Sequence, residues 1–159
     1  MTRYNLGNNS NFPLTTVYNY AYGKWTSAGM SITNNGSGTS GNIRVFGGTR
    51  AQIKAYDNQS IANNQVGLTV GSSTLYAYLD YNGITKNLKK LSSPQKVYIV
   101  DADRTTDQYK HTATHELGHA LGWKGHSPNS SDIMYAYSNG VLSLTSRDKK
   151  HILQFYTDV

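Results

Sequence analysis

The chain has 159 residues, of which 37% are hydrophobic and 15% charged, enough for one domain with a buried core and too few for two full domains. Its 15 basic and 9 acidic side chains give a net charge of +6, but the basic residues are spread from Arg3 to Lys150. That dispersion argues against a dedicated nucleic-acid groove. The absence of cysteine excludes disulfides, thiolate metal sites and cysteine nucleophiles, so a metal can be held only by His, Asp or Glu.

Cellular location is predicted from what the sequence lacks. It contains no run of about 20 apolar residues, the length that a membrane-spanning helix needs. Its first residues have no apolar signal core, and its polarity comes from Asn, Ser, Thr and Gly rather than from charge. Such a chain either stays inside the cell or begins after a removed signal and pro-segment. We favour the second interpretation and expect a secreted or cell-surface protein without a membrane span.

The first hundred residues predict one helix and several strands. Residues 2–6 can form a short strand, and apolar residues three and four apart predict an amphipathic helix over 14–25. The glycine-rich stretch 34–41 is expected to be a loop. Alternating or β-branched runs predict further strands at 42–46, 66–70, 74–81 and 96–100.

The hydrophobic pattern changes in the last third of the chain. A threonine or aspartate at 105–107 can cap a helix that runs to residue 121, and Gly122 is a natural C-terminal stop. Residues 123–141 are polar and aperiodic, which predicts a loop. The sequence at 145–148 resembles a capping box with Asp in the place of Glu, so a short last helix is expected to close the chain.

The stretch that is most informative about function is 115–126, which reads HELGHALGWKGH. His115 and His119 are four residues apart, so in a helix they lie on one face and both rings can reach a single Zn²⁺ at about 2.0–2.1 Å. Glu116 follows the first histidine directly, where its carboxylate can lie beside the metal-bound water without binding the ion. Such a site still needs a third protein ligand.

The third ligand has to come from the remaining histidines or the aspartates, because Glu116 is the only glutamate in the chain and a thermolysin-like site is excluded. His111 would lie about 12 Å from His119 along a helix, too far for both to share one ion with His115, and we expect it at the surface or the cleft rim. His151 is expected to face solvent. His126 follows a glycine that lets the chain turn back toward the metal, and it is the best candidate.

This string, together with Ser127 and the downstream sequence Ser131-Asp132-Ile133-Met134-Tyr135, resembles the metzincin clan of zinc endopeptidases and, within it, the matrixin family. The resemblance extends from about residue 112 to 156, and upstream it rests on the order of elements alone. It implies an α+β fold with a small twisted mixed sheet, an active-site helix, an irregular lower subdomain and a C-terminal helix. It also places Met134 in the Met-turn, packed beneath the zinc ligands rather than bound to the ion.

Two departures from the family pattern bear on the site. The pattern puts its third histidine where this chain has Gly125, and His126 comes one residue later. We expect the loop to bulge at Gly125, which can adopt unusual backbone angles; the alternative is that Asp132 or an extra water completes the site. No histidine precedes His111, so we expect one zinc ion, without the second, structural zinc of vertebrate-type matrixins.

The resemblance implies a single metalloprotease catalytic domain over 1–159, with an upper subdomain of about 1–122 and a lower one of about 123–159. It would be a zinc-dependent endopeptidase that hydrolyses peptide bonds of extracellular proteins. His115, His119 and His126 would hold the metal, and Glu116 would take a proton from the metal-activated water as general base.

The remaining predictions concern the substrate, a second metal and the oligomeric state. A strand within 67–81 would pair with the extended substrate, and the loop 135–141 would form the wall of the specificity pocket. Ca²⁺ is a possible second cofactor, with Asp101, Asp103 and Asp107 as candidate ligands. We expect a monomer that acts on a protein or peptide. The alternative is a catalytically silent zinc-containing adhesion or cell-wall-binding module, motivated by the net positive charge.

Overall fold

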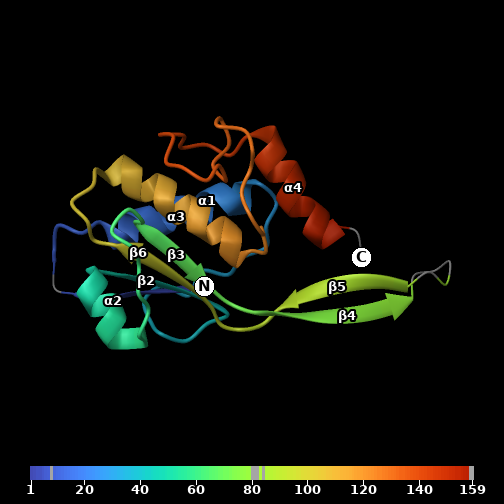
Figure 1. Ribbon diagram of the computed structural model, residues 1–159, viewed down its shortest axis with the longest axis horizontal. Helices are drawn as coiled ribbons and strands as arrows, with labels where there is room; N and C mark the ends of the chain where they lie inside the picture. Colours follow the sequence, from blue (N-terminus) through green and yellow to red (C-terminus); the bar gives the residue numbers. More distant parts are fainter. Residues whose placement is uncertain (8, 80–82, 84, 158–159) are drawn as a thin grey trace.

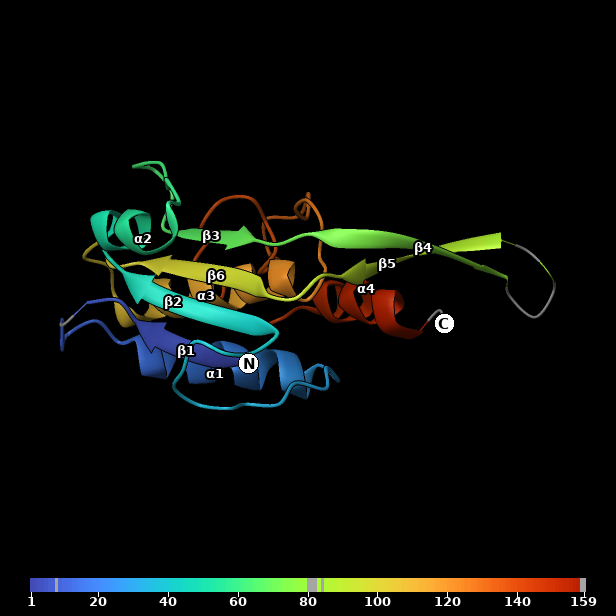
Figure 2. The same ribbon diagram turned by 90° about the horizontal axis from the view of Figure 1, so that it is seen from below.

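A small mixed sheet forms the centre of the computed structural model, which describes residues 1–7, 9–79, 83 and 85–157. Its order is β1 (Thr2–Asn5), β2 (Ile43–Gly48), β6 (Gln95–Val100) and β3 (Gly67–Val70). The first three strands are parallel, whereas β3 is antiparallel to β6 and lies at the edge of the sheet. In Figure 2, α1 (Leu14–Ser27) and α3 (Thr106–Ala120) lie behind this sheet.

The sheet buries apolar side chains on both of its faces. Because successive residues of a strand point to opposite faces, Val97 and Ile99 of β6 join the core with α1 and α3, whereas Tyr98 and Val100 point the other way. There they pack with Ile53 of α2 (Arg50–Asp57). α3 contacts both β6 and β3, so the sheet holds this helix next to its free edge.

The remaining elements extend the molecule beyond this central part. β4 (Ser73–Leu79) and β5 (Thr85–Leu91) form a separate antiparallel hairpin that projects from the body after β3 (Figure 1). The chain after α3 is irregular until α4 (Ser146–Thr157), whose Ile152 is fully buried in the same core as α1 and α3. None of the described helices is both long and apolar enough to cross a lipid bilayer.

The predicted α+β class is confirmed, and the strands and helices that were predicted occur in the expected order. The strand predicted at 74–81 is β4, and residues 80 and 81 lie outside the described residues. Neither α2 nor β5 is among the predicted elements. α2 has eight residues and only one buried apolar side chain, Ile53, so it shows almost no periodicity. Its capping box, in which Thr49 and Gln52 bond each other's backbone N–H, was the available signal.

Candidate active site

The helix α3 begins and ends where its sequence dictates. Thr105 and Gln108 form a capping box, in which each side chain accepts a hydrogen bond from the other residue's backbone N–H. After Ala120 the chain leaves the helix through Gly122, whose φ of +113° strongly favours glycine. The predicted helix and its stop are therefore confirmed, and the turn at Gly122 directs the following loop back toward the helix.

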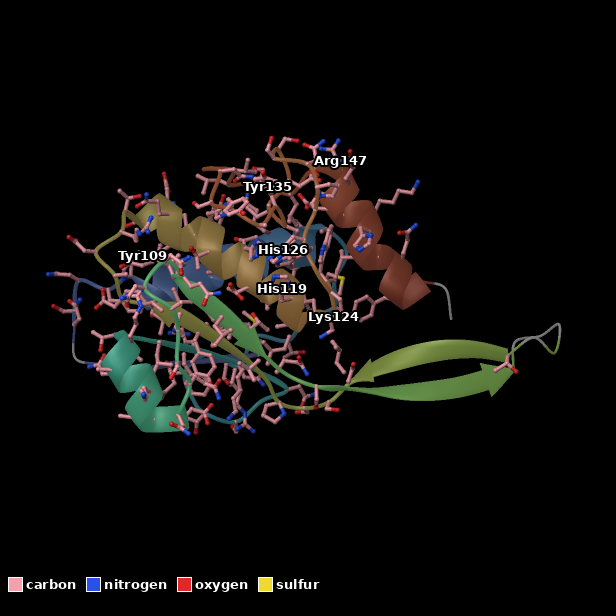
Figure 3. The ribbon with its side chains drawn as sticks, viewed as in Figure 1. Tyr109, His119, Lys124, His126, Tyr135 and Arg147 are labelled. Atoms are coloured by element: carbon pink, nitrogen blue, oxygen red, sulfur yellow. The ribbon has the colours of Figure 1, made fainter. Side chains whose placement is uncertain are left out.

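Three histidines meet at this end of α3. One ring nitrogen from each of His115, His119 and His126 lies within 4.8 Å of the other two. In Figure 3, His119 on the helix and His126 on the loop lie next to each other. In the part of the chain that the structure describes, no other group of three His, Asp or Glu side chains is close enough to hold a metal. The three aspartates considered for calcium form no such group.

The hydrogen bonds of the first two histidines fix which ring nitrogen is free. His115 and His119 bond through Nδ1 to the carbonyl oxygens of Ile133 and Trp123, each at 2.8 Å. A carbonyl only accepts, so Nδ1 carries the proton and Nε2 keeps its lone pair. The two Nε2 atoms are 3.1 Å apart. Two lone pairs at that distance repel each other unless a cation lies beside them.

A proton is poorly suited to be that cation. Burial lowers the pKa of His115 to about 3, and burial also lowers the pKa of His119. Both rings are therefore neutral near pH 7, the form in which imidazole binds a metal. A donor set of three imidazole nitrogens fits Zn²⁺ with one coordination position left open.

The extra residue before His126 is absorbed by the loop. Gly125 has a φ of +73°, and a Cβ atom there would meet nothing within 4 Å, so the bulge needs the backbone freedom of glycine rather than its small size. The rings of His126 and His115 are stacked with centroids 5.3 Å apart. The alternative ligand Asp132 is instead buried and engaged by Ser127, Thr145 and Arg147.

Glu116 lies on the side of α3 that faces the edge strand β3. Its side chain is buried, and its Oε2 accepts a hydrogen bond of 2.6 Å from the Thr69 hydroxyl. Burial raises the pKa of Glu116 to about 7, although the Thr69 hydrogen bond acts in the opposite direction. A Cβ atom on Gly67 would lie 2.7 Å from Glu116 Cγ, so the strand approaches this closely only because residue 67 is glycine. Sequence reasoning missed both Thr69 and Gly67.

Met134 lies beneath the helix, against the glycine of the HELGH string. It is fully buried, and a Cβ atom on Gly118 would come within 2.4 Å of its sulfur and 2.8 Å of Trp25 Cζ2. Gly118 therefore provides the space in which Met134 and Trp25 contact α3. The Met134 side chain packs against Gly118 of α3, and its neighbour Ile133 accepts the His115 hydrogen bond.

A cleft runs along β3 past these side chains. Its cavity of about 300 Å³ is bounded by the edge strand on one side and by the loop after α3 on the other. The lining includes Leu68 and Thr69 of the strand, Glu116 and His119 of the helix, and His126 of the loop. The cleft therefore brings together an edge strand, a buried carboxylate and three ring nitrogens that could hold a metal ion.

The expectation that His111 lies at the surface or the cleft rim is wrong. Its side chain is buried, and its Nδ1 lies 2.8 Å from the carbonyl oxygen of Val141. His111 therefore holds the end of the loop 135–141 against α3. His151, predicted to face solvent, is exposed, and its ring lies against Trp123 with centroids 4.1 Å apart.

Comparison with known families agrees with this geometry. Residues 86–157, a little under half of the chain, match the model of the matrixin family. No curated protein matches the chain. The matched segment contains α3, the three histidines, Met134 and α4. The matched segment is similar to the matrixins, a family of zinc metalloendopeptidases, and the fold and the three-histidine cluster fit a matrixin-like metzincin domain.

Proposed function

We propose that this chain is a zinc-dependent endopeptidase and that residues 1–159 form one catalytic domain, divided by the cleft at about residue 122. The observation that carries the proposal is the convergence of three histidine nitrogens beside the buried carboxylate of Glu116. His115, His119 and His126 hold one zinc ion. When bound, zinc makes a water molecule nucleophilic near neutral pH and stabilises negative charge on the scissile carbonyl oxygen.

Glu116 is the general base and Met134 the Met-turn residue. Burial keeps the Glu116 pKa near neutrality, so the carboxylate can accept a proton from the attacking water and later return it to the leaving amine. Thr69 orients this carboxylate through its hydroxyl. Met134 has no chemical role and supports α3 from below.

The substrate is an extended segment of an extracellular protein or peptide. β3 has a free edge beside the cleft, so its backbone can pair with the substrate main chain and align the scissile bond with Glu116. The loop 135–141, which His111 holds at Val141, forms the wall of the specificity pocket. The enzyme acts as a secreted or cell-surface monomer.

We expect the pH dependence of cleavage to report the contact between Thr69 and Glu116. The Thr69 hydroxyl stabilises the ionised carboxylate, so its removal in Thr69→Val raises the pKa of Glu116 further. A general base must be ionised, and the acid limb of the kcat/KM profile should therefore move to higher pH. Thr69→Ser keeps the hydroxyl and should leave the limb in place. An unshifted limb in a folded Thr69→Val variant would contradict the assignment of Glu116 as base.

The experiment that tests the proposal is cleavage of casein and gelatin by the purified chain, with and without a zinc chelator. Cleavage that the chelator stops and added zinc restores supports the endopeptidase. Cleavage that is insensitive to the chelator would refute a metal mechanism. Zinc binding without cleavage of either protein would instead favour the silent module.

A further inference from the structure

The third histidine differs from the other two in how it is held. His115 and His119 are each oriented by a hydrogen bond from Nδ1 to a backbone carbonyl. The His126 ring makes no such bond to any described residue, and its side chain is exposed on a loop with two left-handed glycines, Gly122 and Gly125. Apart from its contacts with the His115 and His119 rings, the position of His126 depends on the backbone next to it.

Ser127, the next residue, is held by three hydrogen bonds. Its N–H donates to the carbonyl oxygen of Met134 at 2.7 Å, which joins the histidine loop to the Met-turn. Its hydroxyl donates to Asp132 Oδ2 at 2.7 Å and accepts a hydrogen bond from the N–H of Asn129 at 3.2 Å. The position of the His126 backbone therefore depends on where Asp132 lies.

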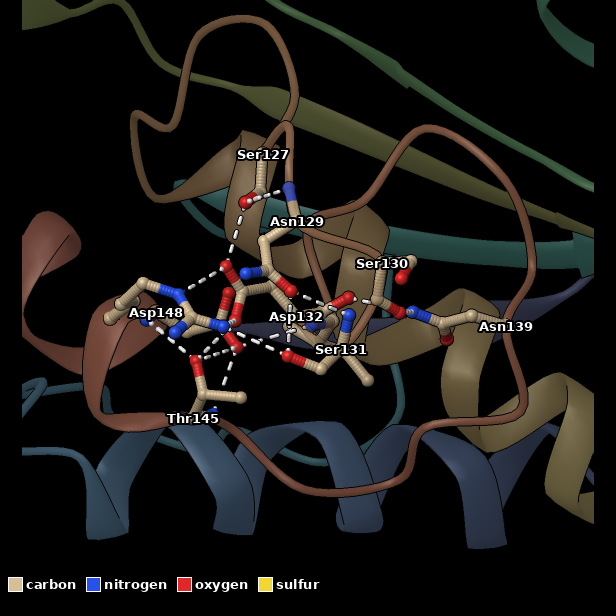
Figure 4. A network of polar contacts seen from close by, with 10 residues as sticks. Ser127, Asn129, Ser130, Ser131, Asp132, Asn139, Thr145 and Asp148 are labelled. Atoms are coloured by element: carbon tan, nitrogen blue, oxygen red, sulfur yellow. Dashed lines mark hydrogen bonds and ion pairs between the residues drawn. The ribbon is translucent and has the colours of Figure 1, made fainter.

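Asp132 is held in turn by the beginning of α4, as Figure 4 shows. Its side chain is almost fully buried, with 1% of its surface exposed. Arg147 donates to both carboxylate oxygens, at 3.1 Å from Nε and 2.9 Å from Nη2, and the Thr145 hydroxyl donates at 2.6 Å. Burial alone would raise the pKa of Asp132, but the hydrogen bonds from Arg147, Thr145 and Ser127 hold it below its usual value. The carboxylate is therefore a fixed anion.

We propose that Asp132 and Arg147 are positioning residues for the third metal ligand and that they act on His126 through the hydroxyl of Ser127. The inference rests on the proposed function, because it requires His126 to bind zinc. Two ligands come from one rigid helix and are each oriented by a backbone carbonyl, whereas the third comes from a bulged loop and takes its rigidity from this carboxylate. Mutation of a residue that supports a metal ligand typically lowers metal affinity by about 10–100-fold.

The test compares the zinc affinity of purified variants by competition with a chelator of known affinity. Ser127→Ala removes the link to Asp132, whereas Ser127→Thr keeps a hydroxyl and serves as the matched control. We expect Ser127→Ala and Asp132→Asn to bind zinc about 10–100-fold more weakly and Ser127→Thr to stay within a few-fold of the parent chain. The absorption spectrum of the Co²⁺-substituted protein should change in the first two variants, because it reports the ligand geometry.

A second control separates positioning from general stability. Asp57→Asn weakens a different ion pair, the one between Asp57 and Lys96 on the other side of the sheet. It should lower the unfolding temperature without changing zinc affinity. Ser127→Ala and Asp132→Asn variants that fold and bind zinc with unchanged affinity would overturn the inference. If Asp132→Asn fails to fold, Ser127→Ala carries the test alone. A parent chain that binds no zinc would refute the proposed function itself.

Discussion

Replacement of Glu116 by glutamine is expected to lower kcat/KM at least about 100-fold while zinc stays bound, because a general base contributes about 10²–10⁴-fold to rate. Gln has nearly the same shape and can still accept the Thr69 hydrogen bond, so the fold should survive. Glu116 is not one of the three residues whose ligand atoms converge, so its replacement should leave the metal site intact. Metal content measured on the same sample separates loss of chemistry from loss of metal.

The same variant is expected to gain stability in its metal-free form. The folded-state pKa of Glu116 is raised from 4.5 to about 7, so its contribution to stability is fully present below 4.5 and is lost as pH rises through 7. Above pH 7 the ionised carboxylate opposes folding, and glutamine does not. Thermal unfolding of the metal-free protein at pH 8 should therefore give Glu116→Gln a melting temperature at least equal to that of the parent chain.

The activity of Glu116 variants also separates the two functions that the sequence leaves open. If Glu116→Ala abolishes cleavage and keeps both zinc and fold, the silent module is excluded, since such a module has no activity to lose. Loss of zinc together with activity would mean that Glu116 supports the metal site rather than the proton transfer. A Glu116→Gln variant that cleaves at the parent rate would refute its role as base.

Replacement of Asp148 by alanine is expected to cause the largest loss of folding stability, about 3–5 kcal/mol. Asp148 is fully buried, and its Oδ2 accepts hydrogen bonds from the N–H of Ile133 at 3.1 Å and the N–H of Thr145 at 2.9 Å. Alanine would leave these donors without a partner in the protein interior. The bond to Ile133 also fixes the residue before Met134, so the Met-turn should loosen.

Urea unfolding of the Asp148→Ala variant measures this loss. Asp107→Ala is the matched control, because Asp107 also lies in the first turn of a helix but is exposed and paired only with Lys110 at the surface. It should cost less than about 1 kcal/mol. Equal losses from the two substitutions would contradict the view that Asp148 joins α4 to the Met-turn.

The convergence of the histidines could be predicted because its determinants are local. His115 and His119 are one helical turn apart, and the glycines at 122 and 125 allow the chain to bring His126 back within the next seven residues. The capping box at 145–148 is likewise local, and it places Asp148 correctly at the start of α4.

The partners of these residues could not be predicted, because they come from distant parts of the chain. Thr69 is 47 residues from Glu116, and nothing in its own surroundings marks it as a contact of that carboxylate. His111 was misplaced because helical spacing gives its distance from His119 but not what covers it, which is the carbonyl of Val141, 30 residues later. The Asp132–Arg147 pair is hidden in the same way, because Asp132 lies in polar loop sequence and its partner comes 15 residues later, in the first turn of α4.

The central claim is that three histidines of this chain hold one zinc ion, and the metal content of the purified protein tests it most directly. Mass spectrometry under native conditions should find one zinc per chain, and a His126→Ala variant that remains folded should lose most of it. A parent chain without zinc, or a His126→Ala variant that keeps zinc with unchanged affinity, would show that these residues do not form the site.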